Sequence, residues 1–221
     1  MASEEWRVAR ARATAGYVLA GGASSRFGSD KALAEFGEKP MLARMLGLVD
    51  HAVSRKELAC KAVVIGAAEK YGTVWTACVE DRWPGEGPLG GIVTALLHTR
   101  KNAPESEWNL IVGCDMPFLT ADWLRFLAER AAGSAAQVVV PHSTNGPEPL
   151  CACWRTDAAE ELQTAFERGV RRVNQGISHL RSEVLDERDW KRFDSAGRLF
   201  WNMNTAADYE EARRIVETEQ R

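Results

Sequence analysis

The stretch YVLAGGASSRFGSDKALAEFG, residues 17–37, decides how the chain is interpreted. It begins as an apolar run, which ends where Gly21 and Gly22 follow each other. Glycines remove side chains at a turn, so backbone N–H groups can approach an anion closely. Arg26 and Lys31 then add positive charge. The stretch therefore predicts a strand followed by a loop that holds phosphate groups.

The spacing of the glycines excludes the two best-known glycine loops. A dinucleotide fingerprint needs G-x-G-x-x-G, whereas the glycines here are Gly21, Gly22 and Gly28. A Walker A loop ends in Gly-Lys followed by Ser or Thr, but Lys31 is followed by Ala32. A nicotinamide-dependent oxidoreductase is therefore disfavoured. The alternatives that stay open are another type of phosphate loop and an ordinary strand-to-helix turn with solvated charges.

The rest of the chain alternates short apolar runs with longer amphipathic runs, which is typical of βα units. Several short runs are continuously apolar, as expected for strands of a parallel sheet covered on both faces. We therefore expect a Rossmann-like three-layer α/β/α sandwich with a mostly parallel sheet. The expected strands are Ala15–Ala20, Ala62–Ile65, Asn109–Val112, Gln137–Pro141 and Leu150–Trp154, and the expected helices are Met41–Val53, Gly91–Thr99, Ala121–Ala131, Asp157–Glu167, Arg171–His179 and Ala206–Glu219.

Length and composition are those of one globular domain. Of the 221 residues, 45% are hydrophobic and 27% are charged, as in ordinary soluble proteins. We expect a flexible N-terminal extension over residues 1–14 and a single domain over residues 15–221. The net charge of −3 argues against general binding of nucleic acids or membranes. The five cysteines lack metal-binding spacing, and we expect them to be reduced in a cytoplasmic protein.

Three polar, turn-rich segments each lie close to the end of an expected strand. They are Gly21–Asp30, Asp81–Gly91 and His142–Pro149. In an open α/β sheet, ligands bind beyond the carboxyl ends of the strands. The three segments therefore predict one binding site at one edge of the sheet.

A carboxylate stands at the end of an expected buried strand. The segment LIVGCDMPFLT, residues 110–120, leaves its strand at Gly113 and presents Asp115, and Thr120 is placed to cap the next helix. Mg²⁺ takes one or two carboxylates and leaves its other positions to water and phosphate oxygens. Beside a phosphate loop, Asp115 is therefore predicted to bind a metal; the alternative is a turn or capping aspartate.

Two further segments carry polar candidates. In VEDRWPGEGPLGGIVTAL, residues 79–96, Asp81 precedes a glycine-rich loop, and its carboxylate can accept two hydrogen bonds from the N1–H and the amine of guanine. A surface turn residue is the alternative. Near the C-terminus, Asn202 and Asn204 are two positions apart. If this segment is a strand, both side-chain amides lie on the same face and point toward a metal or phosphate.

Four blocks together resemble the molybdenum cofactor guanylyltransferases, the MobA-type branch of the nucleotidyltransferase superfamily. They are LAGGASSRFGSDKAL (19–33), EDRWPGEGPLGGI (80–92), VGCDMPFL (112–119) and NMNTAADYEEA (202–212). The first block is similar to the signature L-x-G-G-x-x-x-R-M-G, with Phe27 at the methionine position. The resemblance implies the fold of nucleotide-diphospho-sugar transferases.

The resemblance also implies roles for single residues. Lys31 would contact the phosphates, Arg26 would assist the leaving pyrophosphate, and Asp115 would bind Mg²⁺, with Mn²⁺ as a substitute. Asp81 would read guanine. The residues placed at the nucleotide are Leu19, Ala20, Gly21, Gly22, Lys31, Asp81, Gly90 and Asp115, and those placed at the metal are Asp115, Asn202 and Asn204. The resemblance implies an Asn at the end of the second strand, where this chain has Gly66.

The acceptor side rests on weaker matches. Glu148, Pro149 and Leu150 precede a strand that lines the acceptor in the family, and Arg171 and Arg172 would meet the acceptor phosphate. A solvated helix face is the alternative for the two arginines. The neighbouring Asp30 either orders the glycine loop by accepting N–H bonds or is solvated.

The implied reaction transfers GMP from GTP to the phosphate of molybdopterin and releases pyrophosphate. Transient contact with molybdoenzymes or cofactor-delivery proteins would follow from so labile an acceptor. The sister cytidylyltransferases tend to show L-A-A-G where this chain has LAGG, which favours guanine. A cytidylyltransferase, a sugar-phosphate nucleotidyltransferase and a non-catalytic nucleotide-binding protein stay open as alternatives.

Overall fold

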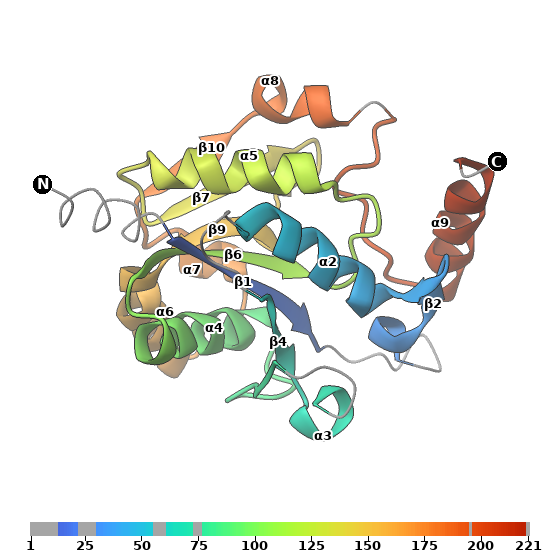
Figure 1. Ribbon diagram of the computed structural model, residues 1–221. Helices are drawn as coiled ribbons and strands as arrows, with labels where there is room; N and C mark the ends of the chain where they lie inside the picture. The colour runs from blue at the N-terminus through green and yellow to red at the C-terminus, as the bar shows by residue number, and fades with distance from the viewer. Residues whose placement is uncertain (1–12, 22–29, 55–60, 73–76, 195, 220–221) are drawn as a thin grey trace, which may run out of the picture.

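The computed structural model describes residues 13–21, 30–54, 61–72, 77–194 and 196–219. Within these residues, eight strands form one sheet, which is the middle layer of the molecule (Figure 1). The strand order is β10-β7-β9-β6-β1-β4-β5, and β8 pairs with β7. The strands are β1 Ala13–Ala20, β4 Val63–Gly66, β5 Cys78–Glu80, β6 Ser106–Gly113, β7 Val138–Ser143, β8 Gly146–Pro147, β9 Cys151–Arg155 and β10 Ser182–Leu185.

The sheet is mostly parallel, as the sequence predicts. The central strand β1 pairs in parallel with β4 on one side and with β6 on the other. The strand β9 runs antiparallel to both of its neighbours, β6 and β7. The carboxyl ends of β1, β4, β5 and β6 therefore meet at one edge, where loops can build a site.

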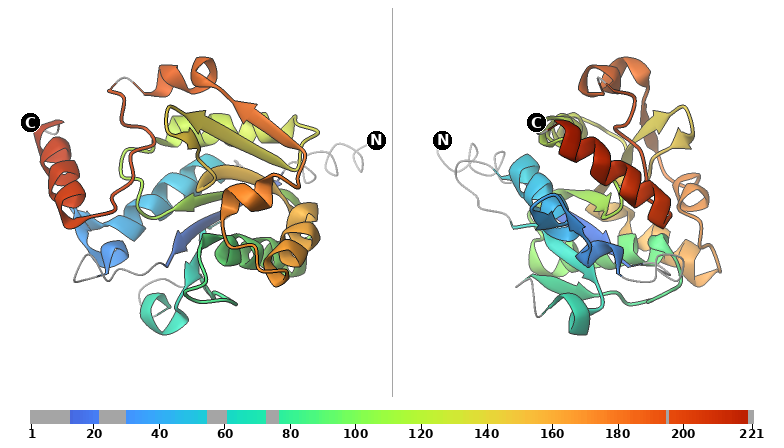
Figure 2. Two further views of the ribbon diagram at one scale, coloured as in Figure 1. Left: turned by 180° about the vertical axis from the view of Figure 1, so that it is seen from behind. Right: turned by 90° about the vertical axis from the view of Figure 1, so that its right-hand side faces the viewer.

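Helices cover both faces of the sheet (Figures 1 and 2). The helices α2 Met41–Val53 and α5 Ala121–Ala132 pack on one face, and α4 Pro88–Asn102 and α6 Ala159–Glu167 on the other. Successive side chains of a strand point to opposite faces, so in β1 Val18 enters the first core and Tyr17 the second. This double burial explains why β1 reads as a continuous apolar run, and it confirms the three layers.

A small unit stands at the carboxyl edge. The two-stranded hairpin of β2 Glu35–Phe36 and β3 Lys39–Pro40 packs against the C-terminal helix α9 Ala206–Glu219 (Figure 1). The rings of Phe36 and Tyr209 lie 6.3 Å apart, and the Tyr209 hydroxyl donates to the carbonyl of Glu35. The remaining elements are η2 Lys31–Leu33, α3 Ala68–Tyr71, η3 Thr156–Ala158, α7 Val173–Ile177, α8 Glu187–Trp190 and η4 Lys191–Phe193.

Several element boundaries differ from those expected. The strand β1 begins at Ala13, so Ala13 and Thr14, assigned above to the N-terminal extension, pair with β6. The helix α4 begins at Pro88 rather than Gly91, since proline suits the first turn of a helix. The helix expected over Arg171–His179 is confined to α7. The short strands β5 and β10 gave no recognisable pattern because each contributes only three or four residues.

Candidate active site

The turn that carries Asp115 is fastened by three backbone hydrogen bonds from different parts of the chain. The Cys114 amide donates to the Leu19 carbonyl at 3.2 Å, the Gly113 amide to the Leu150 carbonyl at 2.8 Å, and the Met203 amide to the Asp115 carbonyl at 2.9 Å. The end of β1, the segment before β9 and the segment before α9 therefore meet at this turn.

Gly113 gives the Asp115 side chain its place. A Cβ atom at Gly113 would lie 2.7 Å from Oδ1 of Asp115, closer than a real side chain allows. The glycine thus lets the half-buried carboxylate fold back over the end of β6. Asp115 stands at the carboxyl edge beside Leu19, as the sequence predicts.

Asn202 and Asn204 flank Met203, whose amide binds the Asp115 carbonyl, so both lie close to that turn. The expectation that they would share one face of a strand is wrong, because this segment has no regular structure. The Asn202 amide donates to the carbonyl of Phe200 at 3.2 Å. The Asn204 backbone amide donates to Asp208 at 2.8 Å, and Thr205 accepts from the Asp208 amide at 3.1 Å, which caps α9 as predicted.

The donor set at this turn suits magnesium. Among the residues that the structure describes, no three His, Cys, Asp or Glu side chains form a metal-binding group of their own. Asp115 offers one carboxylate at this turn, and Asn202 and Asn204 flank the residue whose amide binds its carbonyl. A hard cation held by one carboxylate and by substrate phosphates is the arrangement that Mg²⁺ prefers.

The glycine loop is described only at its two ends. Leu19 and Ala20 end β1, and Gly21 is exposed with open space around its Cα. Gly22 and Arg26 lie outside the described residues, as does the side chain of Lys31. The backbone of Lys31 begins η2.

Asp30 orders the end of this loop. Its carboxylate accepts hydrogen bonds from the Ala32 amide at 3.0 Å and from the Tyr71 hydroxyl at 2.8 Å, and it pairs with the Lys70 ammonium. Burial raises the pKa of Asp30, but the hydrogen bonds from Lys70, Tyr71 and Ala32 outweigh it and hold that pKa below its ordinary value. The ordering role, rather than solvation, is therefore the one the structure supports.

Asp81 follows β5 and is held in a fixed orientation. Its Oδ1 accepts from the Trp83 amide at 3.1 Å and from the Thr94 hydroxyl at 3.1 Å. Thr94 also accepts from the Arg82 amide at 3.2 Å. The carboxylate thus has the contacts of a turn residue, and these contacts orient it at the same edge as Asp115.

Gly90 and Arg171 shape the loop after Asp81. Gly90 is buried, and a Cβ there would lie 3.2 Å from Trp83 and 3.4 Å from Phe166, so this glycine serves packing. The Arg171 guanidinium pairs with Glu86 at 2.6 Å, donates to the Phe166 carbonyl at 2.6 Å and lies 4.0 Å from the centre of the Phe166 ring. These contacts dock Arg171 on the loop after Asp81 and on the end of α6. Arg172 is exposed.

The segment Glu148–Leu150 lies on the other side of Asp115. The Leu150 carbonyl binds Gly113, as described above, and the Ser143 hydroxyl donates to Glu148 at 2.6 Å. Burial raises the pKa of Glu148, and the Ser143 hydrogen bond only partly offsets this. The structure therefore places these residues between the Asp115 turn and the end of β7.

Comparisons with known proteins decide the family. The family model described as "MobA-like NTP transferase domain" matches residues 16–183. The chain belongs to this family. The "Probable molybdenum cofactor guanylyltransferase" of Deinococcus radiodurans is 37% identical over 158 residues, covering 71% of this chain and 75% of the relative. A protein of the same name from Pelotomaculum thermopropionicum is 29% identical over 203 residues, covering 91% and 93%.

A solved structure agrees in fold. The molybdopterin-guanine dinucleotide biosynthesis protein A of Archaeoglobus fulgidus superposes with a TM-score of 0.77, at 24% identity, over 93% of this chain and all of that one. The MobA-like family and its mixed α/β fold, both expected from the four sequence blocks, are therefore confirmed.

Gly66, where the resemblance implies an asparagine, leaves no space for a side chain. A Cβ at Gly66 would lie 2.2 Å from the Ala20 carbonyl oxygen and 2.8 Å from the Tyr71 ring. Asparagine does not fit there in this chain. Tyr71 covers the position instead, and it reaches the glycine loop through Asp30.

The sequence interpretation missed Lys70, Tyr71 and Thr94. All three act on a motif residue, Asp30 or Asp81, rather than belonging to a motif. Thr94 lies 13 positions after Asp81, and its only signal was a polar residue within the apolar run of α4. Tyr71 lies 41 positions after Asp30, with no signal in the sequence that joins them.

Proposed function

We propose that this protein transfers GMP from GTP to the phosphate of molybdopterin, forming molybdopterin guanine dinucleotide and pyrophosphate. The observation that carries the proposal is the Asp115 turn, fastened to the end of β1 on one side and to Leu150 and Met203 on the other. Such a turn can bring a donor nucleotide and an acceptor together. The names of the two relatives support the choice of guanylyl transfer.

The donor nucleotide occupies the side of β1, β4 and β5 in this proposal. Backbone groups of Leu19, Ala20, Gly21 and Gly22 contact the nucleotide, and Lys31 and Arg26 neutralise the phosphates and the leaving pyrophosphate. Asp81 accepts from the N1–H and the amine of guanine. The fixed orientation of Asp81 by Thr94 and Trp83 supports this role.

Asp115, with Asn202 and Asn204 close by, would hold Mg²⁺ or, in its place, Mn²⁺. The bound ion would supply charge neutralisation to the phosphates. The residues of the chain would do the rest: they fix the two substrates and keep the reacting groups aligned, which supplies much of the barrier reduction in phosphoryl transfer.

The chemistry needs no general base. An oxygen of the acceptor phosphate attacks the α-phosphorus of GTP, and the bond from that phosphorus to the bridging oxygen of the β-phosphate breaks. A phosphate monoester already carries a charge of about −1.5 to −2 at pH 7, so no proton has to be removed. No histidine lies in the four motif blocks, in agreement with this scheme.

The setting of the reaction is part of the proposal. No helix among the described residues is long and apolar enough to cross a membrane. Cys78, Cys151 and Cys153 form no disulfide, as in a reducing cytoplasm. We place the reaction there, and we expect the product to pass to molybdoenzymes or to proteins that deliver the cofactor.

The test is turnover with defined substrates. The purified protein is incubated with Mg²⁺, molybdopterin and, in separate reactions, GTP, CTP, ATP or UTP, while pyrophosphate and dinucleotide are quantified. Product with GTP alone supports the proposal. Preference for CTP would replace it with cytidylyl transfer, and nucleotide binding without pyrophosphate release would identify a non-catalytic binder.

A further inference from the structure

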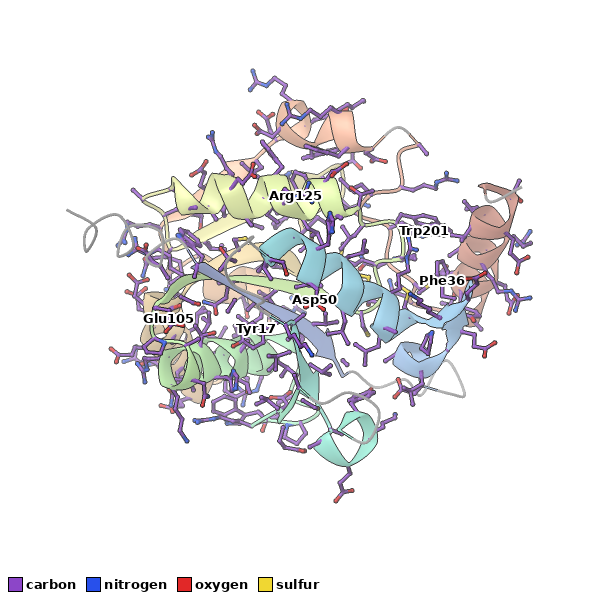
Figure 3. All side chains as sticks on the ribbon, viewed as in Figure 1. Tyr17, Phe36, Asp50, Glu105, Arg125 and Trp201 are labelled. Atoms are coloured by element: carbon purple, nitrogen blue, oxygen red, sulfur yellow. The ribbon has the colours of Figure 1, made fainter. Side chains whose placement is uncertain are left out.

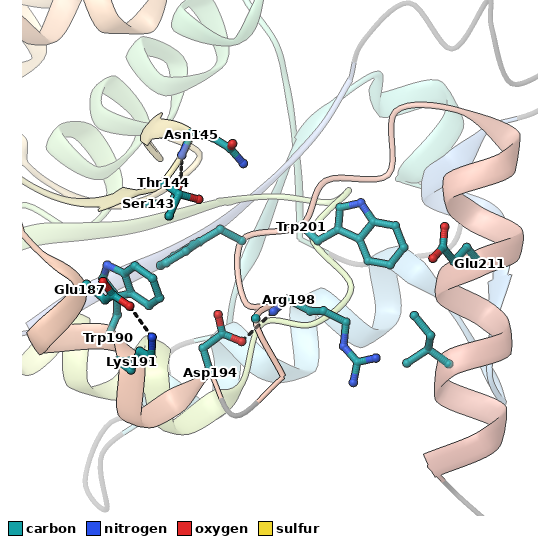
Figure 4. A pocket seen from close by; sticks show the side chains of 13 residues that line it. Ser143, Thr144, Asn145, Glu187, Trp190, Lys191, Asp194, Arg198, Trp201 and Glu211 are labelled. Carbon is teal, nitrogen blue, oxygen red and sulfur yellow. Dashed lines mark hydrogen bonds and ion pairs between the residues drawn. The ribbon is translucent and has the colours of Figure 1, made fainter.

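A cavity of about 800 Å³ opens between the β7–β8 turn, α8 and α9 (Figure 4). Small-molecule sites commonly measure about 300–1,000 Å³. Its wall includes Ser143, Asn145, Trp190, Arg198, Trp201 and Glu211. None of these residues belongs to the donor side of the proposed reaction.

Two walls of the cavity lead directly to the Asp115 turn. Trp201 stands two residues before Met203, whose amide binds the Asp115 carbonyl. Ser143 binds Glu148, two residues before Leu150, whose carbonyl binds Gly113. A ligand in the cavity therefore has a short route to the metal candidate. Figure 3 shows Trp201 at the end of the molecule where Phe36 and α9 lie.

The strand order places the cavity opposite the guanine candidate. Asp81 follows β5, which lies three strands from β6 on one side, whereas β7, which ends at Ser143, lies two strands from β6 on the other. At about 4.8 Å per strand, these offsets are about 14 Å and about 10 Å. Donor base and cavity thus lie on opposite sides of Asp115, as a transfer between two substrates requires.

Trp201 offers a flat surface in the wall of the cavity. Its ring stacks on Phe118 with centres 5.4 Å apart and planes 4° apart, and the Arg198 guanidinium lies 5.2 Å from the Phe118 ring centre. This packing holds the half-buried Trp201 in one orientation. A planar ring system stacks well on such an indole.

Polar side chains that line the cavity suit a heterocycle with an amino-oxo edge. The Glu211 carboxylate on α9 can accept from two N–H donors, and the Asn145 amide in the β7–β8 turn can both donate and accept. Lys191 is paired with Glu187, and the Trp190 indole N–H donates to the His142 carbonyl at 3.1 Å, so these two have partners already.

We propose that this cavity receives the pterin ring system of the acceptor, with Trp201 as its stacking platform. The inference rests on the proposed function, since it names the place of the second substrate. It makes Trp201 a residue that determines acceptor binding without contributing to nucleotide binding.

Kinetics of Trp201→Ala and Trp201→Phe test this directly. Loss of stacking on an aromatic side chain weakens binding about 5- to 100-fold, so we expect the acceptor KM to rise by that factor in Trp201→Ala and far less in Trp201→Phe, with the KM for GTP unchanged. Trp83→Ala is the matched control. Trp83 is also half-buried but packs beside Asp81 and Phe166, so it should affect GTP and not the acceptor.

Binding of pterin-6-carboxylate, followed by quenching of tryptophan fluorescence with GTP and Mg²⁺ present, gives a readout without turnover. We expect half-maximal quenching at a higher pterin concentration in Trp201→Ala than in the wild type, because the stacking surface is lost while the other tryptophans, Trp190 among them, still report binding. An unchanged acceptor KM together with an unchanged pterin concentration for half-maximal quenching in Trp201→Ala overturns the cavity assignment and leaves GMP transfer standing. A wild-type protein that is quenched by pterin-6-carboxylate but forms no dinucleotide from GTP and molybdopterin overturns the proposed function instead.

Discussion

The hydroxyl of Tyr71 donates a hydrogen bond to Oδ2 of Asp30 at 2.8 Å, and this contact ties α3 to the end of the glycine loop. Tyr71 is buried, and Lys70 binds the same carboxylate. Residues 41 positions apart thus fix where the chain leaves the loop and enters η2.

Tyr71→Phe removes only the hydroxyl. Hydrogen bonds to charged groups contribute about 1.5–3 kcal/mol. Because Lys70 keeps its contact with Asp30, we expect the free energy of unfolding to fall by an amount at the lower end of that range. The KM for GTP should rise while the acceptor KM stays constant. Urea unfolding measures the change in stability, and initial rates measure the two KM values. A KM for GTP equal to that of the wild type would contradict the positioning role.

The lowered pKa of Asp30 should make the free energy of unfolding depend on pH. Its folded pKa lies below its ordinary value of 3.8, so its contribution is complete above that value and disappears as the pH falls through the lower folded pKa. Asp30→Asn lacks this contribution at every pH. The difference in unfolding free energy between wild type and variant should therefore shrink below about pH 4, which is near the unfolded pKa of Asp. A difference that is constant from pH 6 to pH 3 would rule this out.

Gly66→Ala is expected to destabilise the protein by about 1–3 kcal/mol, the range for overpacking. The added Cβ would meet the Ala20 carbonyl at 2.2 Å, and backbone cannot give way as a side chain does. Gly47→Ala is the matched control, because nothing lies within 4 Å of its Cβ position and alanine is the better helix residue by about 0.5–1 kcal/mol. Thermal unfolding of the two variants should show shifts of opposite sign.

Asp115→Asn should reduce turnover by about 10²–10³, as for the loss of one electrostatic stabiliser, with the fold intact. The neutral amide has nearly the same shape but lacks the negative charge that attracts Mg²⁺. Asp122→Asn, on the exposed face of α5, is the control. Near wild-type turnover in Asp115→Asn would remove this residue from the metal site, and circular dichroism checks the fold.

Thr94→Val should weaken GTP binding through Asp81. The variant removes the Thr94 hydroxyl from the Arg82 amide and from Asp81 Oδ1, and a hydrogen bond to a charged group contributes about 1.5–3 kcal/mol. Thr94→Ser retains the hydroxyl and should behave as the wild type. Thermal shifts with GTP and CTP provide the measurement. Equal GTP shifts in the valine and serine variants would contradict the assignment of Asp81 as the residue that binds the base.

The short motifs allowed the family and the fold to be predicted, because each motif depends on local interactions. A continuous apolar run that ends in glycines predicts β1 and its loop, and the same reasoning predicts β6 and Asp115. Thr120 and Thr205 were recognisable as helix caps because a cap needs only a hydroxyl and the backbone three residues on. These inferences rest on contacts between residues close in sequence.

What the sequence alone determined was the set of chemically capable residues: the glycine loop, Asp81 and Asp115, and the alternation of strands and helices that brings them to one edge. Only the tertiary structure decided which partners orient them. Each of these residues has partners from distant segments of the chain. They are Tyr71 and Lys70 for Asp30, Thr94 for Asp81, and Leu19, Leu150 and Met203 for the Asp115 turn. Pairing across such distances depends on strand order and packing, which no local pattern encodes. For the same reason, the sequence did not predict the steric conflict at Gly66 or the cavity beside Trp201, because both exist only where separate segments meet.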